Sequence, residues 1–419
     1  MCSRQVLVLK FVWIVGVGLS IASTGAMAAE YSGGTGTQAD PYQIGRAGDW
    51  TTLFSSVEDW GKHFILTASI DFSGAVLMPV GNLEVQFTGV FNGDGYVLSN
   101  GQINLPGIVG TGLFGYVGEG GKIQDVGVEG VDVTGGSSVG GLAGSNSGSI
   151  VSCYTTGAAT AVDEGDTVGG LIGQNSGTVT FSHASGQAAG DYYVGGLVGQ
   201  NDGTVSSCYA SCVVSGNAYV GGLMGENLEA AVTSCYAAGP VTGNAYVAGL
   251  IGDNKGPVRE CYARGPVHCG AGFCLYIGGL MGYDWSESVT SSYWDMEATG
   301  QAVSGGGEGR TTAEMTYPYA ENTYVGWDFA AVWAEDEESS INDGYPYLRE
   351  KAPSEPHPAD VNTDYRIVLS EAIAYLAGWQ QGSNPIGYAI RAAFLWQNGE
   401  AYVYDDGDDP PMCWILAPR

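Results

Sequence analysis

Val194-Gly-Gly-Leu-Val-Gly199 is one copy of a six-residue pattern that recurs along the middle of this chain. The other copies, strict and loose, begin at Val109, Val139, Val168, Val220, Val247 and Ile277. Successive copies start 26 to 30 residues apart. A period of that length is typical of a solenoid, in which each repeat buries its apolar face only against its neighbours.

Each repeat joins short β-branched pieces, such as Gly203-Thr-Val-Ser-Ser-Cys-Tyr209 and Cys212-Val-Val214, through glycine-rich turns. Short strands at fixed spacing, without helices between them, predict an all-β parallel β-helix with one coil per repeat. Paired glycines let neighbouring coils approach closely. We expect an inward leucine column at Leu113, Leu142, Leu171, Leu197, Leu223, Leu250 and Leu280. We expect turn-capping asparagines at Asn146, Asn175, Asn201, Asn227 and Asn254.

Cysteine and tyrosine form two further columns. The cysteines Cys153, Cys208, Cys235 and Cys261 each precede a tyrosine at one place in the repeat. Buried cysteine behaves as a small hydrophobe, so we expect this column to hold mostly free thiols, and Cys269 and Cys274 to form a local disulfide. Strand alternation then turns Tyr154, Tyr209, Tyr236, Tyr262 and Tyr293 outward. That column is either a structural aromatic ladder or a surface for sugar rings.

The first 28 residues resemble a secretion signal. Arg4 and Lys10 flank the start, residues 11–21 are apolar, and Ala26-Met-Ala28 suits a signal peptidase. No other segment is long and apolar enough to cross a bilayer, so we expect a secreted or cell-surface protein without a transmembrane anchor after cleavage. Acidic residues outnumber basic ones 44 to 14. This balance makes nucleic acid and anionic membrane surfaces poor partners, and it favours solubility and attraction for cations such as calcium.

The Val-Gly-Gly-Leu-x-Gly-x-Asn units resemble GLUG repeats, which occur in bacterial surface and secreted proteins. Gly36-Thr-Gln-Ala-Asp-Pro-Tyr-Gln-Ile44 is similar to the opening of that family, and Gly344-Tyr-Pro-Tyr-Leu348 to its closing coil. The resemblance implies a right-handed parallel β-helix and no particular reaction. We divide the chain into a signal peptide (1–28), N-terminal β-rich coils (29–108), the GLUG repeat solenoid (109–295), a closing coil (296–350), a proline-rich linker (351–358) and a C-terminal module (359–419).

The C-terminal module is expected to be small and mainly α-helical, and its first residues match a calcium loop. Oxygen ligands at positions one, three, five, seven and twelve come from Asp360, Asn362, Asp364, the Arg366 carbonyl and Glu371. The loop resembles one half of a dockerin-type EF-hand module, which implies calcium as cofactor and a cohesin-like partner. It departs from the pattern at Tyr365, where glycine is usual, and at Val368. The alternative is a capped surface helix with an acidic entry.

Catalytic constellations are sparse in this sequence. None of the four histidines has zinc-ligand spacing, and no Gly-x-Ser-x-Gly elbow is present. Asp163-Glu-Gly-Asp166 and Glu335-Asp-Glu-Glu338 could pair carboxylates, but such runs are usually solvated loops. We predict a secreted, non-enzymatic protein that serves adhesion or binds a surface glycan or protein ligand. The alternative is a polysaccharide-processing enzyme or scaffold component that carries a dockerin-like module.

Overall fold

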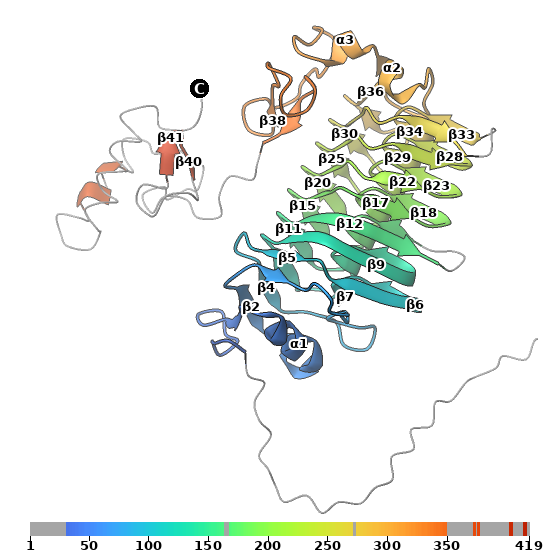
Figure 1. Ribbon diagram of the computed structural model, residues 1–419. Helices are drawn as coiled ribbons and strands as arrows, with labels where there is room; N and C mark the ends of the chain where they lie inside the picture. The colour runs from blue at the N-terminus through green and yellow to red at the C-terminus, as the bar shows by residue number, and fades with distance from the viewer. Residues whose placement is uncertain are drawn as a thin grey trace, which may run out of the picture.

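The computed structural model describes residues 31–162, 167–270 and 274–349, with residues 372–373, 375–377, 402–404 and 414–416. Its main body is a parallel β-solenoid whose coils stack strand on strand, as Figure 1 shows. The predicted all-β parallel solenoid is therefore confirmed. The predicted signal peptide and most of the predicted C-terminal module lie outside the described residues. Within the described part of the chain, no helix is long and apolar enough to span a bilayer.

A ten-stranded parallel sheet runs along one side of the solenoid. It consists of β1 (Tyr42–Ile44), β2 (His63–Leu66), β4 (Val90–Asn92), β8 (Lys122–Gln124), β11 (Ser149–Val151), β15 (Thr178–Thr180), β20 (Thr204–Ser206), β25 (Val232–Thr233), β30 (Val258–Arg259) and β35 (Val289–Thr290). The sheet begins before the first glycine-rich repeat, because β1, β2 and β4 pair in parallel and β4 pairs with β8.

A seven-stranded parallel sheet carries the residues that follow each Gly-Gly-Leu. It consists of β7 (Phe114–Val117), β10 (Ala143–Asn146), β14 (Ile172–Asn175), β19 (Val198–Asn201), β24 (Met224–Asn227), β29 (Ile251–Asn254) and β34 (Met281–Asp284). Equivalent residues pair directly, as Asn175 does with Asn201 and Asn201 with Asn227. The repeat period is therefore the coil period.

The remaining solenoid strands complete each coil between those two sheets. They are β3 (Ile70–Asp71), β5 (Val97–Ser99), β6 (Gln102–Thr111), β9 (Gly127–Gly140), β12 (Tyr154–Ala161), β13 (Val168–Gly169), β16 (His183–Ala184), β17 (Gln187–Ala189), β18 (Tyr192–Gly195), β21 (Tyr209–Ala210), β22 (Val213–Ser215), β23 (Ala218–Gly221), β26 (Tyr236–Ala237), β27 (Val241–Gly243), β28 (Ala245–Ala248), β31 (Tyr262–Ala263), β32 (Val267–Cys269), β33 (Leu275–Gly278), β36 (Tyr293–Asp295) and β37 (Glu308–Arg310). Their mutual pairings are parallel, for example β21 with β26 and β23 with β28.

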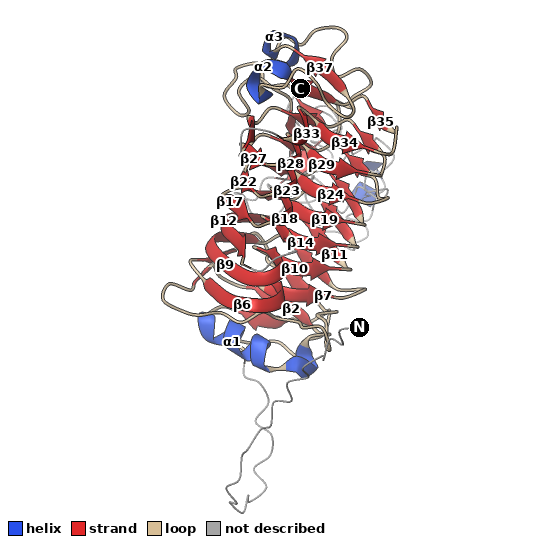
Figure 2. Ribbon diagram, turned by 90° about the vertical axis from the view of Figure 1, so that its right-hand side faces the viewer, coloured by secondary structure: helices blue, strands red, loops and turns tan. Residues whose placement is uncertain are grey.

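Both ends of the solenoid are covered, as Figure 2 shows. At the N-terminal end lie α1 (Ala47–Ser55) and the 3-10 turn η1 (Val57–Asp59). Trp50 of α1 packs its ring edge-on to Phe72, Phe91 and Phe114, at 5.8–5.9 Å between centroids. At the other end lie α2 (Met296–Thr299), α3 (Thr312–Met315) and the antiparallel pair β38 (Trp333–Ala334) and β39 (Tyr347–Leu348). A second antiparallel pair joins β40 (Tyr402–Tyr404) and β41 (Trp414–Leu416).

The leucine column forms the core, as the sequence predicts. Each of the seven leucines is 0 % exposed. The glycines before each leucine are needed because coils approach there: a Cβ on Gly170 would lie 2.3 Å from the carbonyl oxygen of Gly196. One register differs from the prediction. Thr111, rather than Val109, pairs with Val139, so the first loose repeat copy is offset from the others.

The asparagine column is a buried amide ladder, which confirms its predicted stacking. Asn175 Nδ2 donates to Asn201 Oδ1 at 2.8 Å, and Asn201 Nδ2 donates to Asn227 Oδ1 at 2.8 Å. Asn201 Oδ1 also accepts from the Gly203 amide at 3.3 Å, which closes the turn. The ladder continues to Asn254, whose Nδ2 donates to Asp284 Oδ1 at 2.8 Å. Each amide therefore connects its own turn to the next coil.

The cysteine predictions are also confirmed. Cys208, Cys235 and Cys261 are buried and not disulfide-bonded, and their side chains face the interior of the solenoid. Cys269 and Cys274 form a local disulfide. The stacked thiols therefore contribute packing, whereas the disulfide closes the loop that precedes β33.

Candidate ligand-binding groove

The outward tyrosine column is a continuous stack of rings along one corner of the solenoid. Tyr154, His183, Tyr209, Tyr236 and Tyr262 follow one another, with centroids 4.5–5.1 Å apart and ring planes within 3–6° of parallel. Parallel strands lie about 4.8 Å apart, so equivalent rings on successive coils meet face to face. The sequence reading missed His183 because it traced tyrosines alone. Aligning Ser182-His183 with the Cys-Tyr pairs would have found it.

The exposed end of this stack is uncharged near neutral pH. Burial lowers the pKa of His183 to about 4, so its imidazole is neutral. Burial, followed by a hydrogen bond to Glu129, raises the pKa of Tyr154 to about 12. The Tyr154 hydroxyl donates that bond to Glu129 Oε1 at 2.6 Å. The stack therefore offers ring edges and neutral polar atoms to its surroundings.

The C-terminal half of the stack is covered by residues 296–349, here called the closing segment. Tyr236, Tyr262 and Tyr293 pack in one buried cluster with aromatic side chains of that segment, namely Tyr324, Trp327, Trp333 and Tyr345. Tyr262 is fully buried there, and burial raises its pKa well above the usual value. The hypothesis that all five tyrosines form an open sugar-binding face is therefore wrong for this half.

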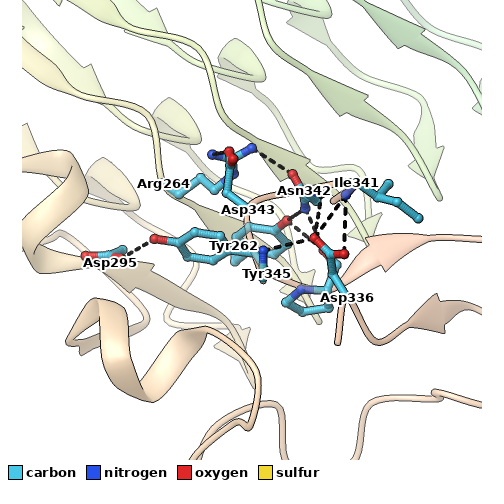
Figure 3. Close-up of polar contacts among 10 residues, drawn as sticks. Tyr262, Arg264, Asp295, Asp336, Ile341, Asn342, Asp343 and Tyr345 are labelled. Atoms are coloured by element: carbon cyan, nitrogen blue, oxygen red, sulfur yellow. Dashed lines mark hydrogen bonds and ion pairs between the residues drawn. The ribbon is translucent and has the colours of Figure 1, made fainter. Parts of the chain in front are cut away.

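Figure 3 shows how the closing segment is fastened to Tyr262 and Asp295. Asn342 Nδ2 donates to the Tyr262 hydroxyl at 2.6 Å, and that hydroxyl donates to the Pro346 carbonyl at 2.8 Å. The Tyr345 ring lies parallel to the Tyr262 ring at 6.1 Å, and its hydroxyl donates to Asp295. These contacts fix where the covered half of the stack begins.

Asp336 organises the closing segment from within. Its carboxylate accepts backbone N–H bonds from Ser340, Ile341, Asn342 and Gly344, at 2.7–3.3 Å (Figure 3). Burial tends to raise the pKa of Asp336, but these amide donors outweigh it and the pKa is lowered. The expectation that the acidic run at residues 335–338 is a solvated loop is therefore wrong for Asp336, which is buried.

The open half of the stack forms the floor of a groove with a volume of about 940 Å³. Its walls come from the corners of successive coils and from the closing segment. Lining residues include Asp94, Asp125, Ser152, Tyr154, Phe181, His183, Ser207, Tyr209, Tyr236, Arg264, Asn342, Tyr347 and Arg349. The corners from Asp94 to Ser207 belong to five successive coils, so they span four steps, or about 19 Å. The groove is long enough for an extended ligand.

Phe181 is the one apolar side chain at the groove's coil corners between Asp125 and Ser207. Its equivalents on the neighbouring coils are Ser152 and Ser207, because Thr180 pairs with Val151 and with Ser206. Phe181 is 42 % exposed and has a left-handed backbone with φ of 51°. Because both equivalents are serines, no equivalent ring stacks on Phe181, unlike the rings of the tyrosine column. In the sequence, Phe181 could have been recognised as unusual because the equivalent residues of the neighbouring repeats are serines.

The two ends of the groove differ in charge. Asp94 and Asp125 lie at the N-terminal end, and Arg264 and Arg349 at the end bounded by the closing segment. The Arg264 guanidinium donates to Asn342 Oδ1 at 2.7 Å and lies over the Tyr345 ring at 5.0 Å. Arg264 is thus held rigidly where the groove ends.

Asp360, Asn362, Asp364, Arg366 and Glu371 lie outside the described residues, and so does the acidic run at residues 163–166. Among the residues that the structure does describe, no group of three or more histidine, cysteine or acidic side chains is arranged to hold a metal ion. The calcium loop therefore stays a prediction from the sequence.

Comparison with protein families finds the GLUG motif at residues 190–214, which supports a GLUG-repeat protein. Halomucin of Haloquadratum walsbyi is 33 % identical over 147 residues, which are 32 % of this chain and 2 % of halomucin. A provisionally named Gly-rich membrane protein of Evansella cellulosilytica is 33 % identical over 129 residues, which are 29 % of this chain and 15 % of that protein. The chain thus spans a small part of both relatives.

Among solved structures, the chain is similar to a provisionally named immunoglobulin A1 protease from Bacteroides ovatus. The TM-score is 0.51 at 20 % identity, and the match covers 77 % of this chain and 96 % of that one. At this identity the likeness shows the fold alone.

Proposed function

We propose that this chain is a secreted, non-enzymatic repeat protein of the bacterial cell surface or exterior, and that it binds an extended glycan along the groove. The observation that carries the proposal is Phe181, an uncovered ring beside a polar groove about 19 Å long. An aromatic face binds the apolar face of a sugar ring, while nearby polar groups bind its hydroxyls. The surface-type names of two relatives support an exterior location.

The stacked tyrosines have a supporting part in this proposal. Each ring face lies against the next ring at 4.5–5.1 Å, so no sugar ring can lie between them. They contribute edges and the hydroxyls of Tyr154 and Tyr209 to the groove floor. Phe181 would supply the stacking face, and Arg264 and Asn342 would bound the ligand at the closing segment. Attachment to a surface glycan is the role we infer.

Substitution of Phe181 by alanine tests the proposal. We expect Phe181→Ala to weaken binding to an immobilised panel of surface polysaccharides by about tenfold, because the variant loses one aromatic contact with the sugar and the area that this contact buries. Tyr317→Ala is the matched control, because Tyr317 is 38 % exposed and does not line the groove. Equal binding by both variants, or no binding by the parent chain, would contradict the proposal.

One observation favours the enzymatic alternative. Asp94 and Asp125 line the same groove, and glycoside hydrolysis uses two carboxyl groups. A polysaccharide-processing enzyme would release shorter products from a bound glycan, and Asp94→Asn and Asp125→Asn would each abolish that release. The non-enzymatic proposal expects binding without products. Chromatography of each polysaccharide after overnight incubation with the protein distinguishes the two.

We also propose that the C-terminal loop binds calcium through Asp360, Asn362, Asp364, the Arg366 carbonyl and Glu371. The spacing of these oxygen ligands supports the proposal. A cohesin-like partner would depend on the same loop. Isothermal titration of the full chain with calcium should show a site that Glu371→Ala removes. A titration that is identical for parent and variant would leave the capped helix as the account of this segment.

A further inference from the structure

A second aromatic ladder runs along a different part of the solenoid surface, with one ring from each of the strands β18, β23, β28 and β33. It contains Tyr193, Tyr219, Tyr246 and Tyr276, with centroids 4.7–4.9 Å apart. The ring planes diverge towards the C-terminal end, from 12° and 17° to 37°. The stacking is therefore least regular at the last ring, Tyr276, which lies on β33; β33 is the last of these four strands in Figure 1.

The backbone at this corner does not require tyrosine. All four tyrosines have a left-handed φ of 49–59°, a conformation that disfavours bulky side chains. Gly110 and Ser138 occupy the same corner in earlier coils with φ of 79° and 53°, since Thr111 pairs with Val139. Smaller residues thus make the same turn. The repeated choice of a large ring indicates a role for the ring itself.

At the open end the ladder widens into an exposed platform made by Tyr276, Tyr283 and Trp285. The Tyr276 and Tyr283 centroids are 4.9 Å apart at 73°, and those of Tyr283 and Trp285 are 4.7 Å apart at 54°. Tyr276 is 44 % exposed and Trp285 is 61 % exposed. The Cys269–Cys274 disulfide constrains the loop that leads into this strand. A large aromatic surface is therefore held in place yet left open to solvent.

Fixed polar groups lie directly beside the platform. Trp285 Nε1 donates to Asp253 Oδ1 at 3.0 Å, which sets the orientation of the indole. Lys255 Nζ lies 3.2 Å from Asp253 Oδ2 and also pairs with Glu226. Both carboxylates are buried, and Gln200 Nε2 donates to Glu226 Oε2 at 2.7 Å. The site thus combines an open ring face with carboxylates whose positions are already fixed.

We propose that this platform is a second saccharide-binding site, which stacks a neutral sugar ring on Trp285 and Tyr276. Lys255, whose side chain is 37 % exposed, donates to ring or hydroxyl oxygens of the sugar, while the buried Asp253 and Glu226 carboxylates hold Lys255 and Trp285 in position. Buried carboxylates and the net charge of −30 disfavour anionic ligands. A quaternary ammonium would need space between the rings, but these rings touch one another. The proposal shares its ligand class with the groove but not its residues.

The test uses the full chain and three neutral probes, cellohexaose, mannohexaose and xylohexaose, in isothermal titration. We expect at least one probe to bind, and Trp285→Ala to weaken one class of site by about tenfold. Trp285→Phe keeps a ring and should restore much of that binding. Phe181→Ala is the matched control in the groove and should leave the Trp285-dependent site unchanged. Unaltered thermal melting of each variant verifies its fold.

The possible results separate the two sites. Binding that is sensitive to Trp285 but not to Phe181 supports the platform and removes the groove proposal. Binding that is sensitive to Phe181 alone overturns the platform. Failure of all three hexasaccharides to bind the parent chain also overturns it, and capture of a protein at the same surface would then identify a different ligand class.

Discussion

Replacement of Asn201 by alanine should be among the most damaging single changes at a polar residue of this solenoid. The substitution removes the bond from Asn175 Nδ2, the bond to Asn227 Oδ1 and the bond from the Gly203 amide. Asn201 is fully buried, so the groups that lose a partner cannot turn to water. Each buried polar group left without a partner costs about 1–3 kcal/mol, and we expect a total loss of about 3–5 kcal/mol.

Asn217→Ala is the matched control within the neighbouring coil. Asn217 also bonds to the equivalent asparagine of the next coil, because Asn244 Nδ2 donates to Asn217 Oδ1 at 3.1 Å. Unlike Asn201, Asn217 is exposed, so water replaces the lost bond. We expect Asn217→Ala to cost less than about 1 kcal/mol.

Urea unfolding followed by far-ultraviolet circular dichroism measures both variants. The shift in midpoint gives the loss of stability when the slope is unchanged, and a lower slope would reveal separate unfolding of neighbouring coils. If the two variants differ by less than about 1 kcal/mol, the buried amide ladder does not stabilise the solenoid as argued.

Three further predictions follow from the packing. Cys208, Cys235 and Cys261 should resist thiol reagents in the native state and react in urea, because all three are buried; rapid native labelling, measured by mass spectrometry, would refute this. Burial lowers the pKa of His183 to about 4, so the free energy of unfolding should fall as pH falls from about 6.5 to about 4, by at most about 3 kcal/mol. In urea titrations at several pH values, His183→Tyr should remove that part of the pH dependence. Asp336→Ala should cost about 3 kcal/mol or more and loosen the closing segment, seen as faster proteolysis there than in the parent; an unchanged cleavage pattern would argue against its role.

The solenoid core could be predicted because it repeats once per coil. Leu197 and Asn201 recur at a constant offset, and only stacked parallel coils satisfy that period with every leucine inside. The same reasoning failed at Val109, because Val109 lies four positions before Leu113 whereas Val139 lies three positions before Leu142, and Thr111 takes the place of the repeat valine. An insertion of one residue inside a repeat shifts the register without changing the repeat motif itself.

The closing segment could not be predicted because its residues have no period. Trp327, Trp333 and Tyr345 meet the tyrosine stack through a fold that no repeat encodes, so the burial of Tyr262 was not foreseen. The sequence analysis also did not predict that the tyrosine rings stack face to face and so cover one another. Strand alternation correctly turned the tyrosines away from the cysteines, but the coil spacing of about 4.8 Å then brings their faces together.

In a periodic fold, residues that obey the period are explained by stacking, so departures from it indicate function. Phe181 replaces a serine, and its ring remains open because no neighbour matches it. Trp285 packs against Tyr283 beside the last ring of the second ladder, and it remains 61 % exposed. Both rings lie beside polar groups. Exposing an aromatic ring to water is unfavourable, and at neither position does packing bury the ring. Serine takes the place of Phe181 on both neighbouring coils, so the backbone there does not require a ring, and we propose ligand binding as the role of both exposed aromatics.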